Sequence, residues 1–236
     1  MSPRYLAFDI ETAADISGPD FNWREHRPIG ITCAAAVSAD EPKPQVWHGR
    51  TDDGTPAARM STEDAASLAK YLRAKVADGY TIITWNGLGF DFDVLAEESG
   101  EADLCRDLAV NHTDLMFHIF CEKGFPVSLA NAAAGMGVPG KAKNISGNQT
   151  PGMWARGEHR QVLDYVAQDV CVTLQIALEA ERRRSFYWRT QAGKIRAFPL
   201  YGSWLSVREA LKLPEPDTSW TDDPIPRPQF TSWLRG

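Results

Sequence analysis

Two carboxylates lie side by side at the end of an apolar segment near the N-terminus. Residues 4–10 alternate as a strand does, with the large apolar side chains on one face. Asp9 and Glu11 are two positions apart, and residues at this spacing on a strand point to the same side. Neighbouring carboxylates repel each other, and both stay ionised only when a cation lies between them. The pair therefore indicates either a metal site or the solvated end of a strand.

A third acid follows a second apolar segment. Residues 80–85 are typical of a buried strand, which Asn86 and Gly87 end before a helix predicted over residues 90–99. Asp91 would lie in the first turn of that helix, near the carboxyl end of the strand, where the functional sites of α/β sheets gather. The alternative role for Asp91 is to cap the helix.

The longest predicted helix carries a tyrosine and a fourth acid. It spans residues 161–184, and its apolar stripe consists of Val162, Val166, Val170, Leu174 and Leu178. Tyr165 and Asp169 are four residues apart and share one face of this helix. Taken alone, this pair fits an acid at the edge of the stripe with a tyrosine packed beside it.

In this order and at these separations, the three motifs resemble the DEDD superfamily of 3′→5′ exonucleases, in its tyrosine (DEDDy) branch. The sequence N-G-x-x-F-D-x-x-x-L around Asp91 is similar to the exonuclease domains of family B DNA polymerases and their stand-alone bacterial relatives. The resemblance covers residues 4–185. The histidine branch has a histidine five residues before the last acid, where this chain has Asp164.

The resemblance implies a ribonuclease H-like fold and two divalent ions, held by Asp9, Glu11, Asp91 and Asp169. It also implies that Tyr165 orients the attacking water. Phosphodiester cleavage needs a hydroxide-like nucleophile, neutralised phosphate charge and a stabilised leaving oxygen, and two cations ~4 Å apart supply all three. Oxygen ligands suit Mg²⁺ or Mn²⁺ better than zinc.

The predicted fold class is α/β, a ribonuclease H-like mixed sheet flanked by helices. This domain would span residues 1–185, and residues 186–236 would form an extended, aromatic C-terminal arm packed on it. Further strands are expected at 29–38 and 45–49, and a loop at 137–152. Other helices are expected at about 62–77, 103–110, 128–136 and 206–211, whereas residues 112–120 are ambiguous. The helix at 62–77 carries a stripe of Leu68, Leu72 and Val76.

A net charge of −6 excludes nucleic-acid binding by bulk charge, so any such binding depends on local groups. The candidates are Asn86 and a strip between the second and third motifs, with Lys141, Lys143 and Arg156 for phosphates and Trp154 for stacking on a terminal base. Solvated cations and a tryptophan in the core are the alternative interpretation of this strip.

Several other classes fit the sequence poorly. The four cysteines form no C-x-x-C pair, and no apolar run reaches the ~20 residues of a membrane span, which together favour a cytoplasmic protein. The glycine pattern of a nicotinamide-binding loop fails at Phe92. A further metal site at His112, Asp114 and His118 is weaker than a role for Asp114 in capping or supporting the main site.

The sequence therefore predicts a metal-dependent 3′→5′ exonuclease that removes nucleoside monophosphates from a nucleic-acid 3′ end, with single-stranded DNA as the expected substrate. The alternatives are an exoribonuclease with the same chemistry and a non-catalytic nucleic-acid-binding module. The sequence names no protein partner.

Overall fold

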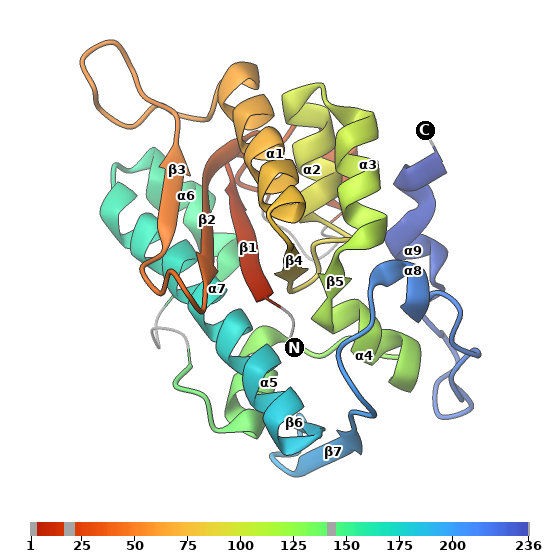
Figure 1. Ribbon diagram of the computed structural model, residues 1–236. Helices are drawn as coiled ribbons and strands as arrows, with labels where there is room; N and C mark the ends of the chain where they lie inside the picture. Colours follow the sequence, from red (N-terminus) through yellow and green to blue (C-terminus); the bar gives the residue numbers. More distant parts are fainter. Residues whose placement is uncertain (1–3, 17–21, 141–144, 236) are drawn as a thin grey trace.

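A mixed β-sheet forms the centre of the molecule (Figure 1). The computed structural model describes residues 4–16, 22–140 and 145–235. In these residues five strands lie in the order β3-β2-β1-β4-β5. Their bounds are Arg4–Thr12 (β1), Ile31–Ser38 (β2), Gln45–His48 (β3), Tyr80–Thr84 (β4) and Thr113–Asp114 (β5). β1 pairs antiparallel with β2 and parallel with β4, so the predicted mixed sheet is confirmed.

Helices cover both faces of the sheet (Figure 1). Around one face lie α1 (Thr62–Ala77), α2 (Asp91–Ser99) and α3 (Ala102–Asn111). The opposite face is covered by α5 (Leu129–Met136), α6 (Thr150–Ala155) and α7 (His159–Arg183). The segment of ambiguous pattern becomes β5 followed by α4 (Leu115–Lys123). Its periodicity was ambiguous because α4 is buried all round and contributes side chains to both cores.

The alternation along β1 divides the core into two. Phe8 and Ile10 pack with α2, whereas Tyr5 and Ala7 pack with α7. Asp9 and Glu11 continue the second series and therefore face α7. Their partners across the β1–β2 ladder are Ala35 and Cys33, two small residues. These small side chains leave room for α7 to pack closely against the sheet at the level of the two acids.

Three local predictions are wrong. Val76 at the end of α1 and Leu178 in α7 are 41% and 38% exposed, because a spacing of four residues drifts by about 40° per step around a helix of 3.6 residues per turn. Residues 150–152, expected within a loop, begin α6. The signal was Pro151, which is favoured at the first positions of a helix because its missing N–H would have no partner there.

The chain after α7 is more ordered than the predicted extended arm. It forms a hairpin of β6 (Ser185–Arg189) and β7 (Ile195–Pro199), followed by α8 (Val207–Ala210), α9 (Pro228–Thr231) and a 3₁₀ turn, η3 (Ser232–Arg235). Aromatic residues attach this segment, as predicted: Phe186 is fully buried, and the indole of Trp204 donates a hydrogen bond to the Ala177 carbonyl. Tryptophan is suited to attach such a segment to the domain, because its side chain combines a large apolar area with one polar group.

Gly135 permits the contact between α5 and the hairpin. A Cβ at this position would lie 2.3 Å from the Trp188 Cα. We therefore expect Gly135→Ala to lower the free energy of unfolding by about 1–3 kcal/mol, as overpacking does elsewhere. Gly140→Ala is the matched control, because its Cβ would meet only the Ala133 methyl group, at 4.0 Å. Urea unfolding of both variants tests this, and equal stability would contradict the packing described.

Candidate active site

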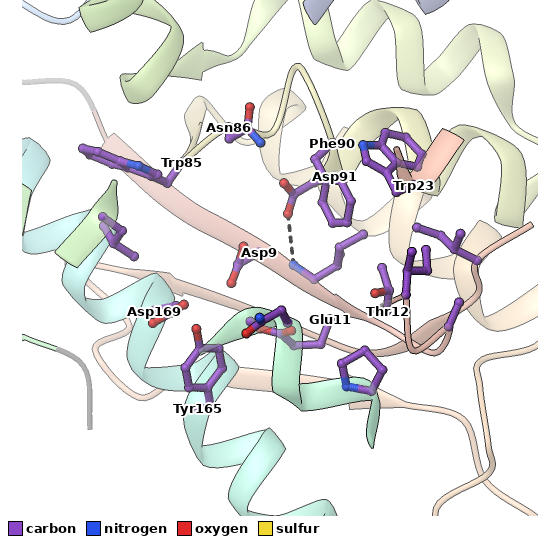
Figure 2. Close-up of a pocket in the computed structure, with 18 of the residues that line it drawn as sticks. Asp9, Glu11, Thr12, Trp23, Trp85, Asn86, Phe90, Asp91, Tyr165 and Asp169 are labelled. Carbon is purple, nitrogen blue, oxygen red and sulfur yellow. Dashed lines mark hydrogen bonds between the residues drawn. The ribbon is translucent and has the colours of Figure 1, made fainter. Parts of the chain in front are cut away.

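Three carboxylates converge in a pocket of about 360 Å³ at the carboxyl-terminal part of β1. Asp9 and Glu11 come from β1 and Asp169 from α7, and each offers an oxygen that lies within 4.8 Å of the other two. Figure 2 shows Asp9 between Asp91 on one side and the α7 residues on the other. The structure thus joins residues that are up to 160 positions apart in the sequence, and three of the four predicted acids form one compact group.

Local structure orients the Glu11 side chain toward this group. The β1–β2 register shifts between Glu11 and Thr12, and such irregularities turn a strand locally. The Thr150 hydroxyl at the start of α6 then donates a hydrogen bond to Glu11 Oε2 at 2.5 Å. Glu11 is 6% exposed, so this bond both satisfies and orients a buried carboxylate. The sequence analysis missed Thr150, and the Thr-Pro pair at a helix start was the only available signal.

Asp91 lies on the other side of Asp9, as the first residue of α2. One of its oxygens accepts a hydrogen bond from the Ile10 backbone N–H at 3.1 Å, drawn dashed in Figure 2. Its carboxyl group also hydrogen-bonds with that of Asp9, and burial raises the pKa of Asp91 well above its ordinary range. Two carboxyl groups bond to each other only through a proton. Asp91 therefore lines the same pocket as the compact group, and Asp9 connects it to that group.

The donor set fits a hard divalent cation. Two oxygens that bind one ion at ~2.0–2.6 Å lie at most about 5 Å apart. The three clustered oxygens meet this limit. A second cation beside Asp9 and Asp91 would neutralise these two adjacent carboxylates. The chemistry of the three clustered carboxylates thus fits a divalent cation.

Tyr165 lies one turn before Asp169 on α7, and its side chain hydrogen-bonds with Asp169. It is 2% exposed and lines the same pocket. Burial raises the pKa of Tyr165 far above its ordinary value, and the charges of Asp169, Glu11 and Asp9 add to this effect. The phenol therefore stays protonated and acts as a hydrogen-bond donor, not as a base.

A buried aspartate fixes the loop between β4 and α2. Asp114 accepts hydrogen bonds from the backbone N–H groups of Asn86 and Leu88 at 3.0 and 2.9 Å, and it caps α4 by accepting from Phe117. Asn86 has a positive φ of 74°, an uncommon conformation that these bonds hold in place. Burial raises the pKa of Asp114 to about 6. The predicted supporting role of Asp114 is confirmed by these contacts.

The buried His112 supports the same loop. Its Nε2 lies 2.9 Å from the Thr84 hydroxyl oxygen, which accepts a bond from the Gly87 N–H. Its Nδ1 donates to the Ala109 carbonyl at 2.7 Å, so Nε2 accepts the Thr84 proton and the ring is neutral. Both ring nitrogens are therefore engaged by protein groups, and His112 is a structural residue.

Three of the residues predicted to contact nucleic acid are described by the structure, and their surroundings differ. Asn86 lines the pocket. Trp154 is 3% exposed, and its indole donates to the Ala57 carbonyl, so the structure places its ring in the core. Arg156 is exposed and pairs with Glu158 at 2.8 Å. Lys141 and Lys143 lie outside the described residues.

Aromatic side chains that the sequence analysis did not assign stand at both ends of the pocket (Figure 2). Trp85 lies at one end, and Trp23 and Phe90 lie at the other, in edge-on contact with ring centroids 5.0 Å apart. Trp85 is only half-buried, so part of its ring faces the pocket. Such rings are suitable partners for planar groups.

Comparison with known proteins agrees with this architecture. The model of the RNase H superfamily matches residues 48–180, more than half of the chain, and the chain therefore belongs to this superfamily. The match includes Asp91, Tyr165 and Asp169 and begins after the strand that carries Asp9 and Glu11. The predicted ribonuclease H-like fold is thereby confirmed. None of the curated proteins compared with the chain matches it.

Among solved structures, the family B DNA polymerase from the hyperthermophilic archaeon Pyrobaculum calidifontis shares the fold, with a TM-score of 0.54 and 21% identity. The similar region covers 76% of this chain and 25% of the polymerase, so the chain spans about a quarter of its length. A product-bound exonuclease I is similar at a TM-score of 0.39 and 15% identity, over 77% of this chain and 44% of that one, too weakly to establish a common fold.

The superfamily fold and the acidic group together support a nuclease. Among the described residues, no helix is both long and apolar enough to span a membrane.

The buried histidines make an acid-sensitive contribution to the stability of the fold. Burial lowers the pKa of His112 and of His118 from 6.5 to about 4. Between these values the unfolded chain binds protons that the folded protein excludes, so stability is lost as the pH falls through this window. Each histidine contributes up to about 1.4 kcal/mol per pH unit. The raised pKa values of Asp91 and Asp114 act with the opposite sign.

We therefore expect His112→Phe to be less stable than the wild type at neutral pH, because Thr84 and Ala109 lose a partner. Its stability should also fall less steeply than that of the wild type between pH 6.5 and about 4. Urea unfolding across this range measures both effects. Parallel pH profiles for the two proteins would show that His112 does not titrate as described.

Proposed function

We propose that this protein is a metal-dependent 3′→5′ exonuclease of the DEDDy type, which removes nucleoside monophosphates from single-stranded DNA. The observation that carries the proposal is the convergence of Asp9, Glu11 and Asp169 within 4.8 Å, with Asp91 and Tyr165 in the same pocket. A cluster of acids with no bound cation costs stability through mutual repulsion, so a binding role explains why the fold assembles it.

The four acids would hold two Mg²⁺ or Mn²⁺ ions, with Asp9 central because it contacts Asp91 and belongs to the compact group. Such ions supply an acidic water, neutralise the phosphate and stabilise the leaving oxygen. Glu11 stays oriented through the Thr150 hydroxyl, and Asp91 through the Ile10 N–H. One side-chain and one backbone donor thus hold these ligands in place before substrate binds, which lowers the cost of reaching the reactive geometry.

Tyr165 would accept a hydrogen bond from the attacking water at its hydroxyl oxygen, because its single proton is donated to Asp169, and would so orient the water's lone pair toward the phosphorus. Its raised pKa excludes the phenolate at neutral pH, so proton removal from the water depends on the ions. The half-buried ring of Trp85 would stack on the terminal base. The 3′→5′ direction and the preference for DNA rest on the resemblance of the three motifs to the DEDDy exonucleases.

The first test of the proposed function is the product pattern from 5′-labelled single-stranded DNA with Mn²⁺. We expect a ladder that shortens by single nucleotides from the 3′ end, and no cleavage of a circular strand of the same sequence. Asp9→Asn should lower the rate by several orders of magnitude, because each ~1.4 kcal/mol of lost barrier stabilisation is tenfold in rate. Cleavage of circular strands as fast as linear strands would indicate an endonuclease. A product ladder from RNA but not from DNA would indicate an exoribonuclease.

A second prediction separates Tyr165 from the metal ligands. Tyr165→Phe keeps the ring and its packing, and we expect the cleavage rate to fall by up to about 10²-fold, the lower end of the effect of a positioned proton-handling group. Binding of Mn²⁺, measured by calorimetry, should stay unchanged in this variant. Asp169→Asn should lose far more activity and should also bind Mn²⁺ more weakly. Full activity in the phenylalanine variant would make Tyr165 a packing residue.

A further inference from the structure

A second hollow, here called the arm groove, lies beside the β6–β7 hairpin. It has a volume of about 950 Å³. The side chains that define it come from the α4–α5 connection, the hairpin and the C-terminal segment: Lys123, Phe125, Trp188, Arg189, Arg196 and Trp220. None of these residues takes part in the proposed chemistry.

The arm groove is positively charged in a protein of net charge −6. Its lining includes three cations and no acid. Arg189 and Arg196 are exposed, and neither forms an ion pair with any residue in the described part of the chain. Lys123 is held over the Phe198 ring at 4.8 Å and lies 3.9 Å from its neighbour Glu122. Cations that lack protein partners are available to an anionic ligand.

Aromatic rings stand beside these cations. Trp220 is 58% exposed, the second most exposed of the large apolar side chains, and it contacts Phe125 edge-on at a centroid distance of 5.6 Å. Phe125 in turn lies 6.1 Å from Trp188. Trp188 and Arg196 are directly opposite each other in the hairpin register, so an aromatic residue and a cation share one face. Cations beside an exposed ring fit phosphates and a base.

The arm groove adjoins the active-site pocket. Leu129 lines the pocket, whereas Val127, two residues earlier, lines the groove. Trp85, at one end of the pocket, donates its indole N–H to the Val127 carbonyl at 3.0 Å. Beneath them, ring contacts connect Trp85 through Phe186 to Trp188, at centroid distances of 6.4 and 6.0 Å. The two hollows thus lie on one continuous aromatic layer.

We propose that the arm groove binds the upstream part of a single-stranded nucleic acid whose 3′ end lies in the active-site pocket. This inference rests on the proposed function. Lys123, Arg189 and Arg196 contact phosphates, and a base stacks on Trp220. The C-terminal segment would thereby supply the local positive charge that the chain as a whole lacks, and the protein would hold long strands more tightly than short ones.

The test compares binding of oligothymidylates of about 4 and about 16 nucleotides, the range of site sizes of single-strand-binding folds. Fluorescence anisotropy without added metal gives affinities at several salt concentrations. In the variant with both Arg189→Ala and Arg196→Ala, we expect roughly tenfold weaker binding of the long strand and a salt slope flatter by about 1.4. Trp220→Ala should weaken binding of the long strand by about tenfold. Binding of the short strand, which fits the pocket alone, should not change.

Lys70→Ala and Tyr201→Ala are the matched controls. Lys70 is an exposed cation on α1, across the sheet from the groove, and Tyr201 is a 91% exposed aromatic residue outside the groove lining. Neither control should alter binding. Unchanged affinity for the long strand in the groove variants would overturn the proposal, and so would groove-dependent binding of an acidic, aromatic peptide with oligonucleotide binding unaltered.

Cleavage of the short strand with Mn²⁺ separates this proposal from the proposed function. Groove-dependent binding without cleavage by the wild type would support the groove and refute the exonuclease. Cleavage of the short strand, together with binding that the groove substitutions do not change, would support the exonuclease and refute the groove. Failure of the wild type to bind the long strand would refute the groove, and failure to cleave either strand with Mn²⁺ would refute the exonuclease.

Discussion

Repulsion among carboxylates is the constraint around which this molecule is organised. Two charges 4 Å apart repel by roughly 4 kcal/mol at an effective dielectric constant of 20. Asp9, Glu11 and Asp169 lie within 4.8 Å of one another, and Asp91 bonds to Asp9. Such an arrangement needs rigid supports and a balancing positive charge. β1, at the centre of the sheet, and α7, the longest helix, supply the supports.

A second set of groups, which are buried and polar, supports the site. Asp114 and the His112–Thr84 pair hold the loop that follows β4, and this loop places Asn86 and Asp91. Gly87 is part of the same turn, because a Cβ there would lie 2.4 Å from the Thr84 hydroxyl oxygen. These groups do not enter the proposed reaction, yet the position of Asp91 depends on them. Burial is the largest cause of their perturbed pKa values, which are no sign of catalysis.

The sequence predicted the strand, helix and acid positions well because these depend on local pattern. The period of two in β1 placed Asp9 and Glu11 on one face, and the period of four in α7 did the same for Tyr165 and Asp169. The residues that hold the acids in place were harder to predict. Thr150 contacts Glu11 across 139 positions, and nothing in the local sequence specifies that approach. Similarly, the period of two in the short strand β6 was hidden by its three successive aromatic residues.

The local pattern also could not separate functional from structural aromatic residues. Trp154 is 3% exposed, whereas Trp85 lines the pocket. Exposure depends on which helix covers which side chain, and that is decided only when α6 docks beside β1. The C-terminal segment shows the same dependence, because Trp204 is buried whereas Trp220 is exposed.

The claim that these acids form a divalent-metal centre is tested most directly by locating the ions. Crystals of the wild type grown with Mn²⁺ and measured by anomalous scattering should show one ion among Asp9, Glu11 and Asp169, and a second ion between Asp9 and Asp91. In that crystal the Asp9–Asp91 hydrogen bond should be broken, because the second ion replaces the proton. A pocket without anomalous density at saturating Mn²⁺, with the Asp9–Asp91 bond intact, would contradict the account.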